Sequence, residues 1–130
     1  MLRAPTMDTR RLPPKLAPFL PLRPVEFHIL LALAGGERHG WSLVREIQQR
    51  GEFGRLMPGN FYRTLRGMLA EGLIEEVGDD RRQDDSDDER RRYFRLTRTG
   101  RETAAAEARR LEALVLESRS KRLLSSKGRG

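Results

Sequence analysis

Asn60, Arg63 and Arg66 follow one another at intervals of three residues, and their side chains suit the binding of nucleic acid. Arginine can bind a guanine edge through two hydrogen bonds or clamp a phosphate, and asparagine can pair with adenine. Because a helix has about 3.6 residues per turn, this spacing brings the three side chains to the same side. The pattern predicts non-covalent recognition of a polyanion.

The helix that carries these side chains is predicted over about residues 58–71, with Pro58 in its first turn. One stripe of this helix is apolar and must face a core, and it consists of Phe61, Leu65, Met68 and Leu69. Tyr62 is expected at the border of core and solvent, where its hydroxyl can donate to a phosphate. Gly59 lets the backbone approach closely. The candidate DNA contacts on this helix are Gly59, Asn60, Tyr62, Arg63 and Arg66.

Two short strands, at residues 73–77 and 93–96, are predicted after this helix, and a highly charged hairpin loop joins them. Helices followed by such a hairpin are typical of a winged helix-turn-helix, whose third helix enters the DNA major groove. The loop arginines expected to touch the DNA backbone or the minor groove are Arg90, Arg91 and Arg92. Residues 83–89 are mostly acidic, so a solvated loop without a role is the preferred interpretation there.

Two further helices must hold the third helix in place. The first runs from Pro24 to the glycines at 35 and 36, is apolar on most sides, and is predicted to be central and buried. The second is predicted over about residues 41–50, and His39-Gly40 before it is predicted as a turn. The expected fold class is mainly α with a small β-hairpin wing: a winged helix-turn-helix plus a C-terminal dimerisation helix.

The C-terminal helix is predicted from Arg98, with Thr97 as its N-cap. It carries an apolar stripe at helical spacing, which consists of Ala104, Ala108, Leu111 and Val115, with Leu114 beside it. An isolated helix of this length is marginal in water, so the stripe should bury against a second copy of the chain. The predicted segments are a flexible Pro/Arg-rich arm (1–21), a winged helix-turn-helix domain (22–97), a dimerisation helix (98–117) and a basic tail (118–130).

Composition narrows the classes of partner. The chain has 130 residues, a formal net charge of +7 and a pI of about 10.9, which favours nucleic acid before an anionic membrane. The absence of cysteine excludes a disulfide framework, a thiolate zinc site and a cysteine nucleophile. No apolar run reaches the roughly 20 residues that span a bilayer, so we expect no membrane partner and a cytoplasmic location.

No residue pattern indicates catalysis or a metal site. His28 and His39 lack partners at a metal-ligand spacing, and no set of Ser, His and Asp suggests a triad. His28 lies in an apolar helix, where a hydrogen-bonded core histidine is commoner than a ligand. The aspartates of the charged loop lack the glycine and the terminal glutamate of an EF-hand. We therefore predict a protein that is not an enzyme and has no cofactor and no metal.

Five short pieces of sequence, each weak alone, form a specific pattern together. They are Pro24-Val25-Glu26-Phe27-His28-Ile29-Leu30, His39-Gly40-Trp41, Pro58-Gly59-Asn60-Phe61-Tyr62-Arg63, Glu71-Gly72-Leu73-Ile74 and Arg92-Tyr93-Phe94-Arg95-Leu96-Thr97. In this order they resemble the PadR family of bacterial transcriptional regulators, over about residues 22–117. The short C-terminal part is similar to the small subgroup, which has one helix after the wing.

The resemblance implies a homodimeric repressor that binds a palindromic double-stranded DNA operator. It implies dimerisation through the C-terminal helix with help from the first helix, and DNA contacts at Asn60, Tyr62, Arg63 and Arg66. Some family members hold flat drugs between aromatic residues of the C-terminal helix, which carries none here, and no small-molecule effector is identified. Two alternatives stay open: a winged helix that binds another protein, and a basic protein that binds nucleic acid without sequence preference.

Overall fold

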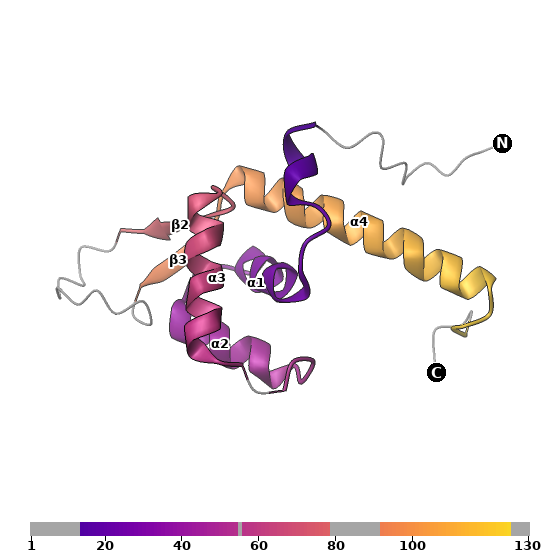
Figure 1. Ribbon diagram of the computed structural model, residues 1–130, viewed down its shortest axis with the longest axis horizontal. Helices are drawn as coiled ribbons and strands as arrows, with labels where there is room; N and C mark the ends of the chain where they lie inside the picture. The colour runs from indigo at the N-terminus through magenta and orange to yellow at the C-terminus, as the bar shows by residue number, and fades with distance from the viewer. Residues whose placement is uncertain (1–13, 55, 79–91, 126–130) are drawn as a thin grey trace.

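The computed structural model of the chain describes residues 14–54, 56–78 and 92–125 (Figure 1). Its elements in chain order are a 3-10 helix η2 (Pro14–Phe19), α1 (Pro24–Ala34), β1 (Arg38–His39), α2 (Gly40–Gln49), α3 (Pro58–Ala70), β2 (Ile74–Val77), β3 (Tyr93–Leu96) and α4 (Arg98–Ser120). This order confirms the predicted fold class, a mainly helical chain with a small antiparallel sheet.

The sheet has three strands in the order β1-β3-β2, and all its pairs are antiparallel. In β2 and β3, Ile74 lies opposite Leu96 and Val77 lies opposite Tyr93. The prediction of a turn at His39-Gly40 is wrong for His39, which belongs to β1 and pairs with Tyr93. Strand β1 pairs with the edge of β3 that faces away from β2. The Gly40 N–H extends this pairing by donating to the Arg92 carbonyl at 3.0 Å.

The core forms around α1, which Figure 1 shows end-on between α2, α3 and α4. Its central residues Ile29, Leu30 and Leu33 are 2% exposed or less, as the apolar sequence of this helix predicted. Around them pack buried apolar side chains from the other elements: Leu43, Ile47, Phe61, Leu65, Met68, Leu73, Ile74 and Phe94. Truncating one of these to alanine costs about 2–5 kcal/mol. Helix α3 contributes Phe61, Leu65 and Met68 to this core and packs against α2 and β2, which set its orientation.

The segment before α1 corrects the prediction of a flexible arm over residues 1–21. Its η2 turn lies against α4, and Leu16 within it is 2% exposed. Phe19 and Leu20 also pack against the core, because burying these apolar side chains outweighs the cost of ordering the turn. Residues 1–13 of the predicted arm lie outside the described residues.

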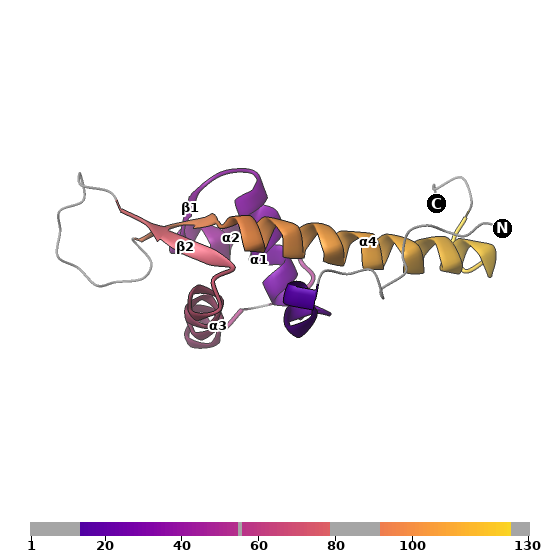
Figure 2. The ribbon, with the colours of Figure 1, turned by 90° about the horizontal axis from the view of Figure 1, so that it is seen from above.

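Helix α4 begins as predicted, with the Thr97 hydroxyl accepting the Gly100 N–H at 2.9 Å, and continues to Ser120. Its first half packs on α1 and η2, where Thr103, Ala106 and Glu107 are buried. Its second half extends beyond the helices and sheet that surround α1, as the two perpendicular views show (Figures 1 and 2). Within the described ranges, no helix is long and apolar enough to cross a bilayer.

Candidate nucleic-acid interface

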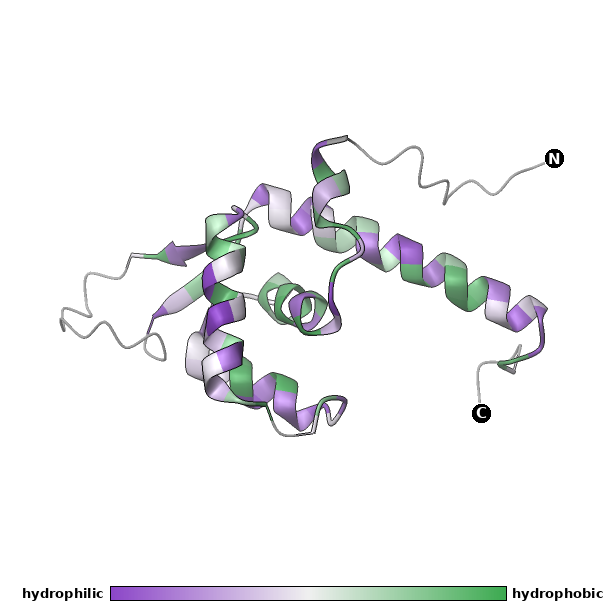
Figure 3. Ribbon diagram, viewed as in Figure 1, coloured by the Kyte–Doolittle hydropathy of each residue, from purple (hydrophilic) through white to green (hydrophobic). Residues whose placement is uncertain are grey.

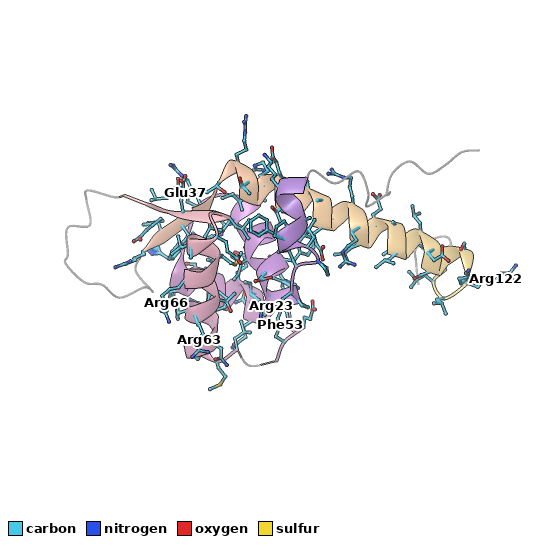
Figure 4. All side chains as sticks on the ribbon, turned by 45° about the horizontal axis from the view of Figure 1, so that its top comes forward. Arg23, Glu37, Phe53, Arg63, Arg66 and Arg122 are labelled. Carbon is cyan, nitrogen blue, oxygen red and sulfur yellow. The ribbon has the colours of Figure 1, made fainter. Side chains whose placement is uncertain are left out.

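Helix α3 separates apolar and polar side chains as its sequence predicted. Phe61, Leu65 and Met68 are buried against the core, while Asn60, Arg63 and Arg66 are exposed. Leu69, which was expected on the buried stripe, is partly buried at its edge. Figure 3 shows polar residues along the side of α3 that faces the viewer, and Figure 4 shows Arg63 and Arg66 extending from this helix.

A hydrogen bond joins two of the predicted contacts on α3. The Arg63 guanidinium donates to Asn60 Oδ1 at 2.9 Å, and both side chains are exposed. The Thr64 hydroxyl donates to the main-chain carbonyl of Asn60 at 3.0 Å, so it does not compete for the Asn60 amide. The first turns of α3 therefore present an ordered polar pair.

Tyr62 lies deeper than the predicted border of core and solvent. It is 9% exposed, and its ring meets the Phe61 ring edge to face with 5.5 Å between centroids. Gly59, by contrast, lies in the open: a Cβ atom added there would meet nothing within 4 Å. The helix start thus leaves its backbone accessible to a large ligand.

A hollow of about 330 Å³ lies beside this face, between the start of α1 and the outer side of α3. Its lining residues are Arg23, Glu26, Asn60, Arg63, Thr64, Gly67 and Glu71. Glu26 is already engaged, since one carboxylate oxygen accepts the Arg23 main-chain N–H at 2.9 Å and the other lies 3.7 Å from the Arg23 guanidinium. Sequence reasoning missed this hollow because no spacing within a helix relates α1 to α3.

Of the three predicted wing arginines, Arg92 lies among the described residues. Arg90 and Arg91, with the acidic residues 83–89, lie outside the described residues. Arg92 precedes β3, and its guanidinium pairs with Glu76 of β2 at 3.2 Å. Arg92 thus lies at the start of β3, where its ion pair with Glu76 connects it to β2.

A second arginine lies on the outer side of the sheet. Arg95 of β3 donates to Glu75 of β2 at 2.7 Å and lies 3.7 Å from Glu37. The hydrogen bond to Glu75 is the main cause that raises the pKa of Arg95, so this side chain stays charged at any physiological pH. The pair ties β2 to β3 on their exposed face.

Comparison with known proteins identifies the family. The sequence model of the transcriptional regulator PadR-like family matches residues 29–106. The chain belongs to this family. A relative, Transcriptional regulator Rv3488 of Mycobacterium tuberculosis (strain ATCC 25618 / H37Rv), is 34% identical over 96 residues, which make up 72% of this chain and 80% of the relative.

Solved structures support the fold of this PadR-like regulator. The complex structure of hsRosR-S4 gives a TM-score of 0.56 at 20% identity, over 82% of this chain and 97% of that chain. A mutant of Lactococcus lactis ZitR gives 0.55 at 16% identity, over 82% and 64%. The adhesin competence repressor AdcR from Streptococcus pyogenes gives 0.51 at 17% identity, over 85% and 74%. These likenesses show the winged-helix fold. The role in transcription regulation follows from the family match.

A chain of polar contacts fixes the loop that leads into α3 of the PadR-like chain. His28 of α1 bonds to Glu52 through Nε2 at 2.7 Å, and Arg50 donates to its Nδ1 at 2.7 Å. Because arginine can only donate, Nδ1 of His28 is the acceptor, and Nε2 carries the hydrogen that it donates to Glu52. Glu46 extends the network by accepting from Arg50 and from Arg38 of β1, each at 3.1 Å.

In this network, His28 connects two parts of the chain. Its side chain is 15% exposed and joins α1 to the loop between α2 and α3, as a hydrogen-bonded structural histidine. In the same loop, the Leu56 N–H donates to Gln48 Oε1 at 2.7 Å. Among the residues described, no group of three or more His, Asp or Glu side chains is arranged to hold a metal ion.

The residues predicted for dimerisation fall into two groups on α4. Ala104 is partly buried and packs against the core of its own chain. Ala108 is exposed, Leu111 is half-buried, and Leu114 and Val115 are 52% and 40% exposed. Leu116 is 60% exposed but lies two residues after Leu114, so it points to another side of α4.

Proposed function

We propose that this PadR-like regulator is a repressor that binds a palindromic operator as a homodimer. The observation that carries the proposal is the outer face of α3, where Asn60, Arg63 and Arg66 are exposed opposite the buried side chains Phe61, Leu65 and Met68. Such a helix, placed after α2 and beside a β-hairpin, fits the DNA major groove. The wing would lie on the DNA backbone or in the minor groove.

Individual roles follow from the chemistry of each side chain. Arg63 and Arg66 would contact base edges or phosphates, and Gly59 would let a phosphate approach the helix start. Tyr62, with its buried ring, would serve the DNA backbone rather than a base. In the wing, Arg90, Arg91 and Arg92 would contact phosphates, and Arg92 would do so while it keeps its ion pair with Glu76.

The exposed half of α4 supports the homodimer. Leu114 and Val115 are apolar and exposed, and they lie beyond the part of α4 that packs on α1. A second copy related by a two-fold axis would cover this surface, with Ala108 and Leu111 beside it. Two-fold symmetry would place the two α3 helices about 10 base pairs apart, so the operator would consist of inverted half-sites.

The test is a gel-shift assay with the region upstream of the gene, repeated over a series of salt concentrations. We expect sequence-specific retardation by the wild-type chain and a loss of about 1–3 kcal/mol on Arg63→Ala. Arg101→Ala is the matched control, because Arg101 is an exposed arginine on a different helix, α4. Tyr62→Phe should weaken binding to all sequences about equally, because it removes a backbone contact.

The outcomes separate the alternatives. A salt-sensitive smear on any duplex would indicate a basic protein without sequence preference, and no binding at all would favour a protein-interaction module. Unchanged operator binding by a folded Arg63→Ala, Tyr62→Phe double variant would remove α3 as the reading helix. Repression itself is measured with a reporter gene behind the operator: expression should fall when the regulator is present and recover with Arg63→Ala.

A further inference from the structure

The hydrogen bond between Asn60 and Arg63 fixes what α3 can offer to a base. A guanidinium group has donors and no acceptor, so the Asn60 amide must turn its oxygen toward Arg63. The distance between Arg63 Nη1 and Asn60 Oδ1 is 2.9 Å, within the range of a good hydrogen bond. This hydrogen bond therefore fixes the orientation of the Asn60 amide, with its oxygen toward Arg63.

This orientation conflicts with the usual way in which asparagine reads DNA. Asparagine recognises adenine through two hydrogen bonds, in which its oxygen accepts from N6 and its nitrogen donates to N7. Here the guanidinium of Arg63 stands at that oxygen. The positive charge disfavours the approach of the N6 amino group, which is itself a donor.

The pair presents donors instead. The Asn60 amide nitrogen and the remaining N–H groups of Arg63 all donate, and both side chains are exposed. Guanine shows two acceptors, O6 and N7, on its major-groove edge, whereas adenine shows one acceptor beside a donor. A surface made of donors therefore matches guanine better than adenine.

The surroundings leave room for such a base. Gly67 lies one turn after Arg63, and a Cβ atom added there would meet nothing within 4 Å. Both residues line the hollow between α1 and α3. Two carboxylates, Glu26 and Glu71, line this hollow; Glu26 is held by Arg23, and the Arg63 guanidinium donates to Asn60.

We propose that Asn60 is a positioning residue that orders Arg63, and that the pair selects guanine in each half-site. This inference rests on the DNA-binding function proposed above and deepens it. Ordering a long side chain before binding saves about 0.5–1.5 kcal/mol, or about 2- to 12-fold in affinity. The expected loss on Asn60→Ala is of that size, while the loss on Arg63→Ala is about 5- to 150-fold.

The experiment begins by selecting duplexes from a randomised pool with the full-length wild-type chain. Affinities for the selected duplex are then measured for wild type, Asn60→Ala, Arg63→Ala and the double variant, with Arg101→Ala as control. We expect Asn60→Ala to weaken binding without relaxing any adenine position, and to add no loss once Arg63 is alanine. Replacing the selected guanine by 7-deazaguanine, which lacks N7, should weaken the wild type and leave Arg63→Ala unchanged.

Two results would overturn the inference. If Asn60→Ala removes an adenine preference and its effect adds fully to that of Arg63→Ala, Asn60 reads a base itself. If the selected half-site contains no guanine that is sensitive to 7-deaza substitution, Arg63 does not read guanine. In both cases the chain still binds DNA selectively, so the proposed function as a DNA-binding regulator stands. A wild-type chain that selects no sequence would contradict both the proposed function and this inference. Thermal melting shows that each variant is folded.

Discussion

Gly100 lies so close to Leu73 that a Cβ atom added at Gly100 would stand 1.9 Å from the Leu73 carbonyl oxygen. The same carbonyl accepts the Thr97 main-chain N–H at 3.2 Å, and the Thr97 hydroxyl donates to the Gly72 carbonyl at 2.6 Å. The start of α4 is thus joined to the turn that ends α3. This joint sets the position of α4 relative to α3.

The first prediction concerns this close approach. Gly100→Ala should lower the free energy of unfolding by about 1–3 kcal/mol, because the backbone must shift to admit the methyl group. Gly67→Ala is the matched control: it lies within α3 with nothing within 4 Å of the added Cβ, and should raise stability by about 0.5–1 kcal/mol. Urea denaturation of the two variants measures both values. Changes of the same sign would contradict the described packing at Gly100.

The second prediction concerns the cap of α4. Thr97→Val keeps the shape of the side chain and removes the hydroxyl that accepts from Gly100 and donates to Gly72. We expect a loss of about 0.5–2 kcal/mol and faster hydrogen exchange in the first turn of α4. Thr64→Val is the control, since its hydroxyl only serves the Asn60 carbonyl in its own helix, and a change within about 0.5 kcal/mol is expected. Equal losses in both variants would argue against the joint.

Features of the fold that depend on neighbouring residues could be predicted from the sequence, whereas features that depend on distant parts of the chain could not. The polarity of α3 could be predicted because Phe61, Leu65 and Met68 repeat at the period of their own helix. Strand β1 could not, because Arg38 and His39 become a strand through pairing with Phe94 and Tyr93, far along the chain.

The same distinction applies to other features of the fold that the sequence did not predict. Burial of Leu16 depends on α4, which begins more than eighty residues later, and partial burial of Ala104 depends on the core that α1 supplies. For the candidate site, the exposed donors on α3 were predicted from their spacing. The bond from Arg63 to Asn60 was not, because spacing places two side chains near one another without stating which one binds the other.

The third prediction concerns the N-terminal residues. Residues 1–13 contain Arg3, Arg10 and Arg11, so their removal should weaken binding about equally for operator and random DNA and flatten the salt dependence. The truncation should stop at residue 13, because Leu16 is buried and its loss would destabilise the fold. Affinity is measured over a salt series on both duplexes. A loss confined to the operator would mean that this segment reads bases, as minor-groove arms do.

The last prediction concerns assembly through α4. Leu114 is 52% exposed, so Leu114→Glu should leave the fold of one chain intact while it places a charge in the proposed interface. We expect the dimer to dissociate at least about tenfold more readily, because burying an unpaired carboxylate costs more than 1.4 kcal/mol. Ala105→Glu is the control: at about 100° per residue, Ala105 lies on the side of α4 opposite Leu114 and is exposed, so this variant should stay dimeric.

Sedimentation velocity at micromolar concentration measures the assembly, and gel shifts on one and two half-sites measure how assembly affects DNA binding. Leu114→Glu should weaken binding to the two-half-site operator far more than to one half-site. A wild-type chain that sediments as a monomer, or an equal effect of both glutamates, would remove this face of α4 as the dimer interface.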